Sequence, residues 1–105
     1  MDFQTLRHEL KTRYPFSGDR YPELRAASTE QLKQFARRHL LLHLTKSLGK
    51  LATQVEVVDH GGSDDIAVTE EALVKLVLNA LRYAQIEEFP EERLLERIPE
   101  FLAKD

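Results

Sequence analysis

The chain of 105 residues contains no cysteine, which excludes disulfides, thiolate metal sites and cysteine nucleophiles together. It has no run close to the roughly 20 apolar residues that cross a bilayer, so we expect no membrane association. Its charged start, with Asp2, Arg7 and Glu9, is unlike a signal peptide, and we therefore expect a cytoplasmic protein. Neither a glycine-rich phosphate loop nor a serine–histidine triad pattern occurs.

What the chain does contain is typical of one soluble domain, with 42% apolar and 31% charged residues. Its size allows a core but leaves room for a second subunit to add burial. Residues 1–50 carry ten Lys or Arg against five Asp or Glu, a net charge of +5, and residues 51–105 carry five against thirteen, a net charge of −8. We expect these halves to pair within the fold or across a dimer, rather than to bind nucleic acid.

The most informative segment is one long amphipathic helix, predicted from Ser28 to His60. Ser28 is a good N-cap because Gln31 can complete a capping box, and Gly61 can close the helix. At ~1.5 Å per residue this helix would approach ~45 Å, longer than such a domain is wide, so it should bend, break or project. The positions that we expect on its buried face, from steps of three and four residues, are Leu32, Phe35, Ala36, Leu40, His43, Leu44, Leu48, Leu51, Ala52, Val55 and Val58.

Before the long helix we predict a short helix from Asp2 to about Arg13, followed by an irregular connector over residues 15–27. The connector contains Phe16 and Tyr21, whose rings should hold it in place.

After the long helix, Thr69 is expected to cap a third helix, and Pro90 to begin a last one that Pro99 kinks or restarts. The third helix should be the central core helix, because its apolar face is wide enough for burial between neighbours. That face comprises Leu73, Val74, Leu76, Val77, Ala80, Leu81 and Ala84. Only the short run from Val55 to Val58 hints at a strand.

Short loops between amphipathic helices favour antiparallel packing. The sequence therefore predicts one all-α domain over residues 1–105, an antiparallel bundle of about four helices. Residues 1–27 would supply the first helix and the wrapped connector, and residues 28–105 the core helices.

Two segments carry a family resemblance. Residues 44–52 read LTKSLGKLA, and residues 72–84 read ALVKLVLNALRYA. Together they resemble the core helices of the MazG-like, all-α nucleoside triphosphate pyrophosphohydrolases, in which a Leu-Gly-Glu-Leu-Ala type segment precedes a Leu-Ala-Asp-Val-Leu type segment. The resemblance covers roughly residues 40–98 and implies a MazG-like helical bundle.

The same resemblance locates four metal-ligand positions. In that family an ExxE pair on the first core helix and an ExxD pair on the second hold magnesium. The matching positions here are Ser47 and Lys50, then Ala72 and Lys75. All four carboxylates are missing, and a protonated lysine cannot ligate a cation. The resemblance therefore implies a degenerate member that cannot run the family's reaction in the family's way and needs no cofactor.

Lys46, Lys50 and Lys75 could instead bind the phosphates of a nucleotide as point charges, without a metal. In the alternative interpretation, their charged ends extend into solvent beside an apolar stripe, as lysines often do.

A second cluster consists of acidic residues around the predicted loop. Glu56, Asp59 and His60 share a helical face, and Glu70 and Glu71 follow across the loop. A displaced magnesium site built from Glu56, Asp59 and Glu71 is one interpretation. The other is a solvated acidic face, or salt bridges to Arg82, Arg93 or Arg97.

His39 and His43 stand one helical turn apart and could offer two imidazoles to zinc, although the sequence names no third ligand. Such histidines more often fill a helix interface. Lys33, Arg37 and Arg38 form a small basic patch that we interpret as a solvated face.

Three functions are consistent with these observations. The first is a catalytically inactive MazG-like protein with a binding, regulatory or assembly role, which would act as a homodimer or higher homo-oligomer and could bind a nucleotide. The second is a divergent pyrophosphohydrolase that uses Glu56, Asp59, Glu70 and Glu71, with Mg²⁺ as its cofactor. The third is an unrelated helical interaction module whose apolar faces dock a partner helix.

Overall fold

The computed structural model describes residues 1–104, apart from the side chain of Glu91. Asp105, the last residue of the predicted domain, lies outside the described residues. No strand occurs in the described part, and the all-α prediction with four helices is confirmed. Nor does this part contain a helix with the length and apolar character needed to cross a bilayer. The elements are α1 (Phe3–Arg13), the 3-10 turn η1 (Pro22–Leu24), α2 (Thr29–Asp59), α3 (Ile66–Ile86) and α4 (Glu91–Leu102).

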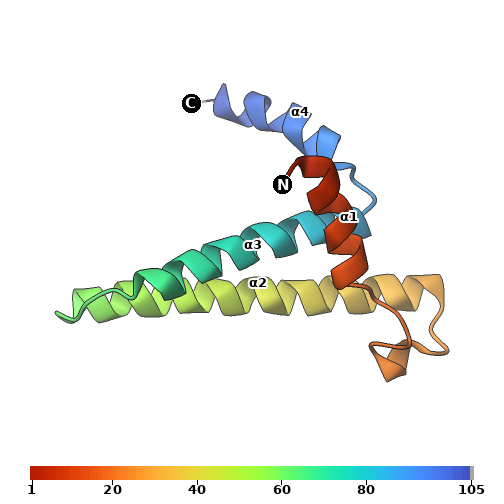
Figure 1. Ribbon diagram of the computed structural model, residues 1–105, viewed down its shortest axis with the longest axis horizontal. Helices are drawn as coiled ribbons and strands as arrows, with labels where there is room; N and C mark the ends of the chain where they lie inside the picture. Colours follow the sequence, from red (N-terminus) through yellow and green to blue (C-terminus); the bar gives the residue numbers. More distant parts are fainter. Residues whose placement is uncertain (105) are drawn as a thin grey trace.

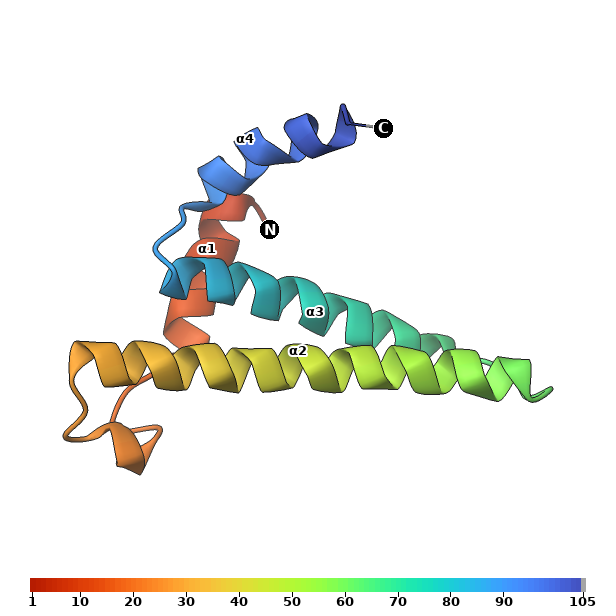
Figure 2. The same ribbon diagram turned by 180° about the vertical axis from the view of Figure 1, so that it is seen from behind.

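α2 and α3 form a long antiparallel pair, and the other helices gather at one end of it (Figure 1). α1 crosses the C-terminal part of α3, where Arg82 Nε donates to the Tyr14 carbonyl at 3.0 Å and Gln85 Nε2 donates to the Arg7 carbonyl at 3.2 Å. α4 leaves the same end and points away from the pair (Figure 2). The predicted antiparallel packing therefore describes α2 and α3, whereas α1 crosses α3 near the end of the pair and α4 points away from it.

α2 begins and ends as the sequence predicts. The Gln31 backbone N–H donates to Ser28 Oγ at 3.1 Å, and the Ser28 N–H donates to Gln31 Oε1 at 2.9 Å, which completes the capping box. Gly61 has a φ of +86°, the left-handed conformation that glycine adopts at helix ends. The sequence predicted that so long a helix would bend, break or project. α2 projects, because it is one continuous helix of 31 residues in a molecule 51 Å long.

The predicted cap of α3 is wrong. The N-cap is Asp65, whose Oδ1 accepts from the backbone N–H groups of Ala67 at 3.1 Å and Val68 at 3.4 Å. Thr69 lies inside the helix, and its hydroxyl donates to Asp64 Oδ1 at 3.1 Å. Aspartate is the better N-cap because its carboxylate is the stronger acceptor, so α3 starts one turn earlier than expected.

The end of the chain also differs from the prediction in detail. Pro90 is the N-cap of α4 rather than its first helical residue, which still suits a residue without a backbone N–H. Pro99 lies inside α4, which continues to Leu102, so no restart occurs there. The run from Val55 to Val58 belongs to α2 and is not a strand.

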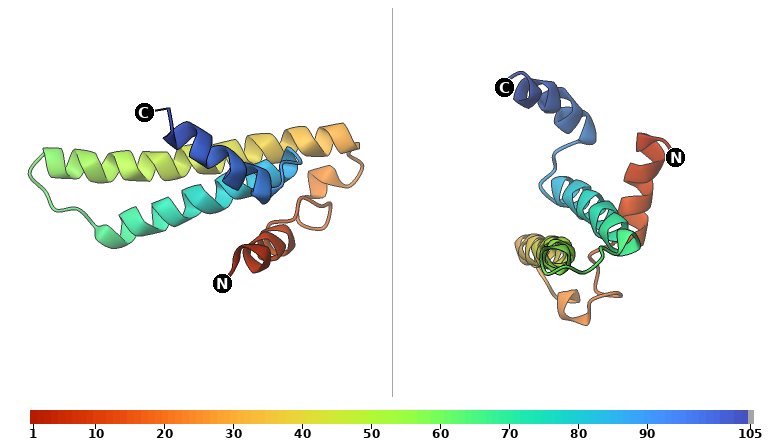
Figure 3. Two further views of the ribbon diagram at one scale, coloured as in Figure 1. Left: turned by 90° about the horizontal axis from the view of Figure 1, so that it is seen from above. Right: turned by 90° about the vertical axis from the view of Figure 1, so that its left-hand side faces the viewer.

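The buried core is small. α3 does not act as a fully covered central helix, since Leu73, Val74 and Val77 are each at least half exposed. That prediction is wrong for the single chain, because α1 and α2 cover only part of the circumference of α3 (Figure 3). The apolar residues that are buried are Leu10, Leu24, Ala36, Leu40, Ala72 and Ala84.

Candidate anion-binding site

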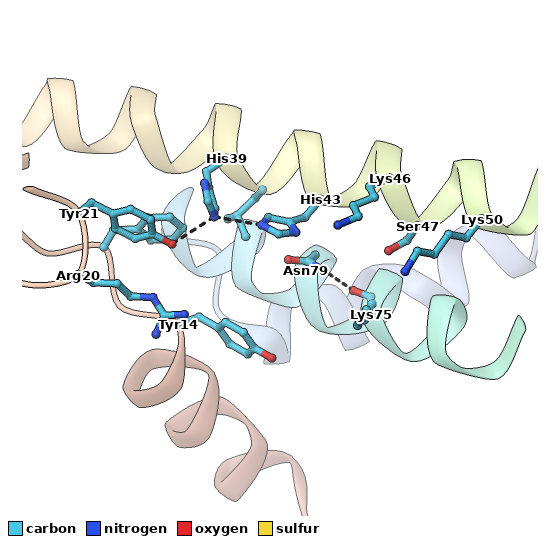
Figure 4. A pocket seen from close by; sticks show the side chains of 12 residues that line it. Tyr14, Arg20, Tyr21, His39, His43, Lys46, Ser47, Lys50, Lys75 and Asn79 are labelled. Carbon is cyan, nitrogen blue, oxygen red and sulfur yellow. Dashed lines mark hydrogen bonds between the residues drawn. The ribbon is translucent and has the colours of Figure 1, made fainter. Parts of the chain in front are cut away.

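A cavity of about 210 Å³ lies between α2, α3 and the connector that follows α1 (Figure 4). The α2 positions that line it, among them His39, Lys46 and Lys50, recur at steps of three and four residues and so share one helical face. Its lining residues are Tyr14, Phe16, Arg20, Tyr21, His39, Leu40, His43, Lys46, Ser47, Lys50, Lys75 and Asn79.

Four permanent cations and no carboxylate line this cavity: Arg20, Lys46, Lys50 and Lys75. Like charges gathered in a partly enclosed space create a positive potential that attracts anions. Among the described residues, Lys75 is the one of the four with a carboxylate partner, its Nζ lying 2.8 Å from Glu71 Oε1. The charges that line the cavity therefore favour an anion.

Glu71 lies beside the cavity. The hydrogen bond and charge of Lys75 lower the pKa of the Glu71 carboxyl, and the charge of Lys50 lowers it further. The carboxylate therefore stays ionised at neutral pH and competes with an incoming anion for both lysines.

His39 and His43 form the other half of the wall. Their Nε2 atoms are 3.1 Å apart, and the Tyr21 hydroxyl lies 3.1 Å from His39 Nε2. One ring nitrogen must donate and the other accept, so the contact suits a pair that shares one hydrogen. Burial lowers the pKa of His39, and the nearby charges of His43 and Arg20 lower it further, whereas Glu23 raises it.

Aromatic rings fix the connector against α2, as the sequence predicts. Phe16 stacks on Tyr21 with ring centroids 5.7 Å apart, and Tyr21 packs against Phe35 at 5.0 Å. The guanidinium of Arg82 lies 5.4 Å from the centroid of Phe16, so α3 also holds this ring. These contacts position Arg20 and Tyr21 beside the cavity.

The structure brings together most of the positions singled out by the family resemblance. Ser47, Lys50 and Lys75 line the same cavity, together with the predicted phosphate ligand Lys46. Ala72 does not line it and is almost completely buried, with only 1% of its surface exposed. A serine, an alanine and two lysines do not offer the oxygen ligands that magnesium requires, so these residues do not fit the family's metal.

The acidic residues do not assemble in this way. No group of three or more His, Asp or Glu side chains in the described residues is arranged to hold a metal ion, so Glu56, Asp59 and Glu71 do not form one coordination shell. Nor do these acids bridge to the expected arginines: Arg82 binds the Tyr14 carbonyl and Gln85, and Arg97 pairs with Glu100 at 2.7 Å. Glu70, Glu56 and Asp59 are exposed, as a solvated acidic face would be.

The two histidines of α2 do not form a complete zinc site. His39 and His43 converge, but within the described residues no third His, Asp or Glu joins them. The basic patch is partly used for structure: Arg37 forms a bidentate ion pair with Glu87, in which Arg37 Nη2 lies 2.8 Å from Glu87 Oε2.

Sequence reasoning missed the contributions of Tyr14, Arg20 and Asn79. Tyr14 and Arg20 belong to an irregular segment, and no periodic pattern indicates which way such residues point. Asn79 lies one turn after Lys75 on α3, so the four-residue spacing could have placed it at the site.

Comparison with known proteins found no matching family model, no matching curated protein and no matching solved structure. The candidate site therefore rests on its own geometry.

Proposed function

We propose that this protein binds the phosphate end of a nucleotide, or of a similar phosphorylated small molecule, without a metal and without hydrolysing it. The observation that carries the proposal is the convergence of Lys46, Lys50 and Lys75 with Arg20 on one cavity that no carboxylate lines. In this proposal the chain is a degenerate MazG-like protein in which cationic side chains do the work that metal ions do in its catalytic relatives.

The size of the cavity supports a phosphate group as the part that enters. At about 210 Å³ it is smaller than the ~300 to 1,000 Å³ of sites that enclose whole drug-sized ligands. The phosphates would lie among the lysines, and the remainder of the ligand would extend past Tyr14, which is 44% exposed at the rim. Lysines suit this role because each provides a mobile point charge with three donors.

The residues of the cavity support the proposal that the protein does not hydrolyse its ligand. Cleavage of a triphosphate requires an activated water and stabilisation of the charge that develops on the phosphates. The lysines can stabilise that charge, but no lining carboxylate can activate water, and the His39–His43 pair uses its facing nitrogens on each other. We therefore propose a binding, regulatory or assembly role, and we propose that the chain acts as a homodimer or higher homo-oligomer.

The test is calorimetric titration with ATP, and separately with inorganic phosphate, in the presence of EDTA. We expect binding by the wild-type protein, a loss of about fivefold in affinity for Lys50→Met, and about 20-fold for Lys50→Met combined with Lys75→Met. Lys11→Met, which removes a lysine from the exposed surface of α1, is the matched control and should bind like the wild type. Equal binding by all variants would contradict the proposal.

The second arm asks whether the protein is an enzyme. The wild-type protein is incubated with each common nucleoside triphosphate and Mg²⁺, and pyrophosphate release is measured. We expect none. If the wild-type protein released pyrophosphate and a variant with both Glu56→Gln and Asp59→Asn did not, the result would support the divergent pyrophosphohydrolase. In that case the remaining metal ligands would come from a second copy of the chain.

A further inference from the structure

The face of the α2–α3 pair that points away from the cavity carries a large exposed apolar surface. Leu41, Leu48 and Val55 of α2 are 57%, 57% and 61% exposed. On α3, Ile66, Leu73 and Val77 are also exposed. Single exposed apolar residues are normal, but a contiguous set of this size marks an interaction site.

The helical repeat places this surface opposite the cavity. Leu41 and Leu48 each stand two residues after a cavity-lining residue, His39 and Lys46, which corresponds to about 160° around the helix axis at 3.6 residues per turn. On α3, Leu73 stands two residues before the cavity residue Lys75 and Val77 stands two residues after it, so both lie on the side of the helix opposite Lys75. Because α1 and the connector pack on the cavity side, the apolar residues named above on the opposite face stay exposed in the part of the chain that the structure describes.

The apolar residues on this face follow a heptad pattern. On α2 they stand at alternating steps of three and four residues, the a and d spacing of a helix that pairs with another helix through a coiled-coil seam. On α3, Ile66, Leu73 and Ala80 recur every seven residues, with Val77 between the last two. The α2 series is Leu41, Leu44, Leu48, Leu51, Val55 and Val58.

Charges beside the seam indicate which partner fits it. Arg38 and Asp59 occupy the same heptad position, next to the seam, near opposite ends of α2. Both are exposed, and neither has an ion-pair partner among the described residues. A second α2 running antiparallel would place Arg38 of each copy near Asp59 of the other, whereas a parallel copy would place these flanking positions on opposite sides of the seam, where Arg38 does not meet Asp59.

We propose that this face, the α2 seam with its α3 flank, docks a second copy of the same chain in antiparallel orientation. A two-fold interface must be self-complementary, and the seam is self-complementary both in its apolar residues and in its flanking charges. Its aliphatic residues pair with one another when α2 is reversed about the point between Gly49 and Lys50: Leu41 meets Val58, Leu44 meets Val55 and Leu48 meets Leu51. In this register Arg38 of each copy lies about half a helical turn from Asp59 of the other. The cavities of both copies then face outward and remain accessible, so this inference stands or falls independently of ligand binding.

The first experiment measures mass by sedimentation equilibrium over protein concentrations from 1 to 200 µM, a range chosen around the ~µM affinities of modest interfaces. We expect a dimer for the wild type and at least a 30-fold weaker dimer for Leu48→Lys and for Leu73→Lys. Both side chains are at least half exposed in the single chain, so these variants should keep their helical circular dichroism. Leu102→Lys, which changes an exposed leucine of α4, is the control and should leave the dimer intact. A wild-type monomer at 200 µM, or a dimer indifferent to Leu48 and Leu73, overturns the proposal.

The second experiment tests orientation with charge exchange. Arg38→Asp alone and Asp59→Arg alone should each weaken the dimer about fivefold, because each change turns two attractive contacts into repulsive ones. The double variant R38D/D59R restores both contacts only if the helices are antiparallel, and we expect wild-type affinity for it. A double variant as weak as the sum of the single changes would overturn the antiparallel arrangement.

Discussion

The two faces of the α2–α3 pair are made from alternating residues of the same two helices, yet they differ in almost every physical respect. The cavity face carries lysines and histidines and is covered in part by α1 and the connector. The opposite face carries exposed leucines and valines with no cover. The comparison shows that the periodic spacing of residues on α2 and α3 defines two separate surfaces. The chain covers part of one surface with its own residues and leaves the apolar residues of the other exposed.

Neighbouring leucines of α2 provide the sharpest test of this comparison. Leu40 is 3% exposed and Leu41 is 57% exposed. Leu40→Ala should lower the free energy of unfolding by about 3 kcal/mol because it leaves a cavity in the core. Leu41→Ala should cost less than about 0.5 kcal/mol when urea denaturation is followed at a concentration where the chain is monomeric. Equal losses would show that the two faces are not distinct.

The second prediction concerns how the cavity face is covered. Arg82 is 9% exposed, donates to the Tyr14 carbonyl and to Gln85, and lies over the ring of Phe16. Arg82→Met should destabilise the fold by about 2 kcal/mol, since it removes the part-buried hydrogen bond to the Tyr14 carbonyl together with the guanidinium that lies over Phe16. Arg97→Met, at an exposed ion pair of α4, is the control and should cost less than about 0.5 kcal/mol. A small loss for Arg82→Met would mean that α1 is held by other contacts.

The third prediction concerns the carboxylate that competes for the lysines. Glu71→Gln should raise the affinity for inorganic phosphate about threefold, because it frees Lys75 and removes a negative charge near Lys50. Glu70→Gln, one residue earlier and exposed, is the matched control for the change in net charge. If Glu71→Gln weakened binding, Glu71 would be acting to position Lys75 rather than to compete for it. Calorimetry in EDTA measures all three proteins.

The smallest expected effect is a pH dependence confined to the cavity face. The pKa of His39 in the fold is lowered from 6.5, chiefly by burial, so the unfolded chain takes up this proton more readily than the folded chain. The free energy of unfolding should therefore be fully maintained above pH 6.5 and decrease as the pH falls below it. Urea denaturation in an anion-poor buffer should show this slope for the wild type and for His8→Gln, and a flatter one for His39→Phe. A slope unchanged in His39→Phe would assign the effect to other groups.

Local signals in the sequence predicted most of the helices because they depend on neighbouring residues. The capping box of Ser28 and the turn at Gly61 are of this kind. The prediction of a Thr69 cap was wrong because Asp65, four residues earlier, offers the stronger cap.

The coverage of α3 and the full set of cavity residues could not be predicted in the same way. Periodicity shows that Leu73 and Val77 share an apolar face, but it does not show whether another segment of the chain reaches that face. Arg20 reaches the cavity through the path of an irregular connector, which depends on ring contacts of Phe16 and Tyr21 distant along the sequence. Lys50 and Lys75 could be predicted to lie at one site because the family resemblance aligns them with metal-ligand positions.

The smallness of Ala72 and Ser47 limits which residues the contact between α2 and α3 can accept. Both side chains are almost completely buried, with 1% and 4% exposure, where α2 and α3 run side by side. A glutamate introduced at Ala72 would have to enter this contact as an unpaired charge or force the helices apart, and either outcome is strongly destabilising. A carboxylate at this contact therefore cannot be introduced by a single substitution without a loss of stability, because the packed helices leave no room for it.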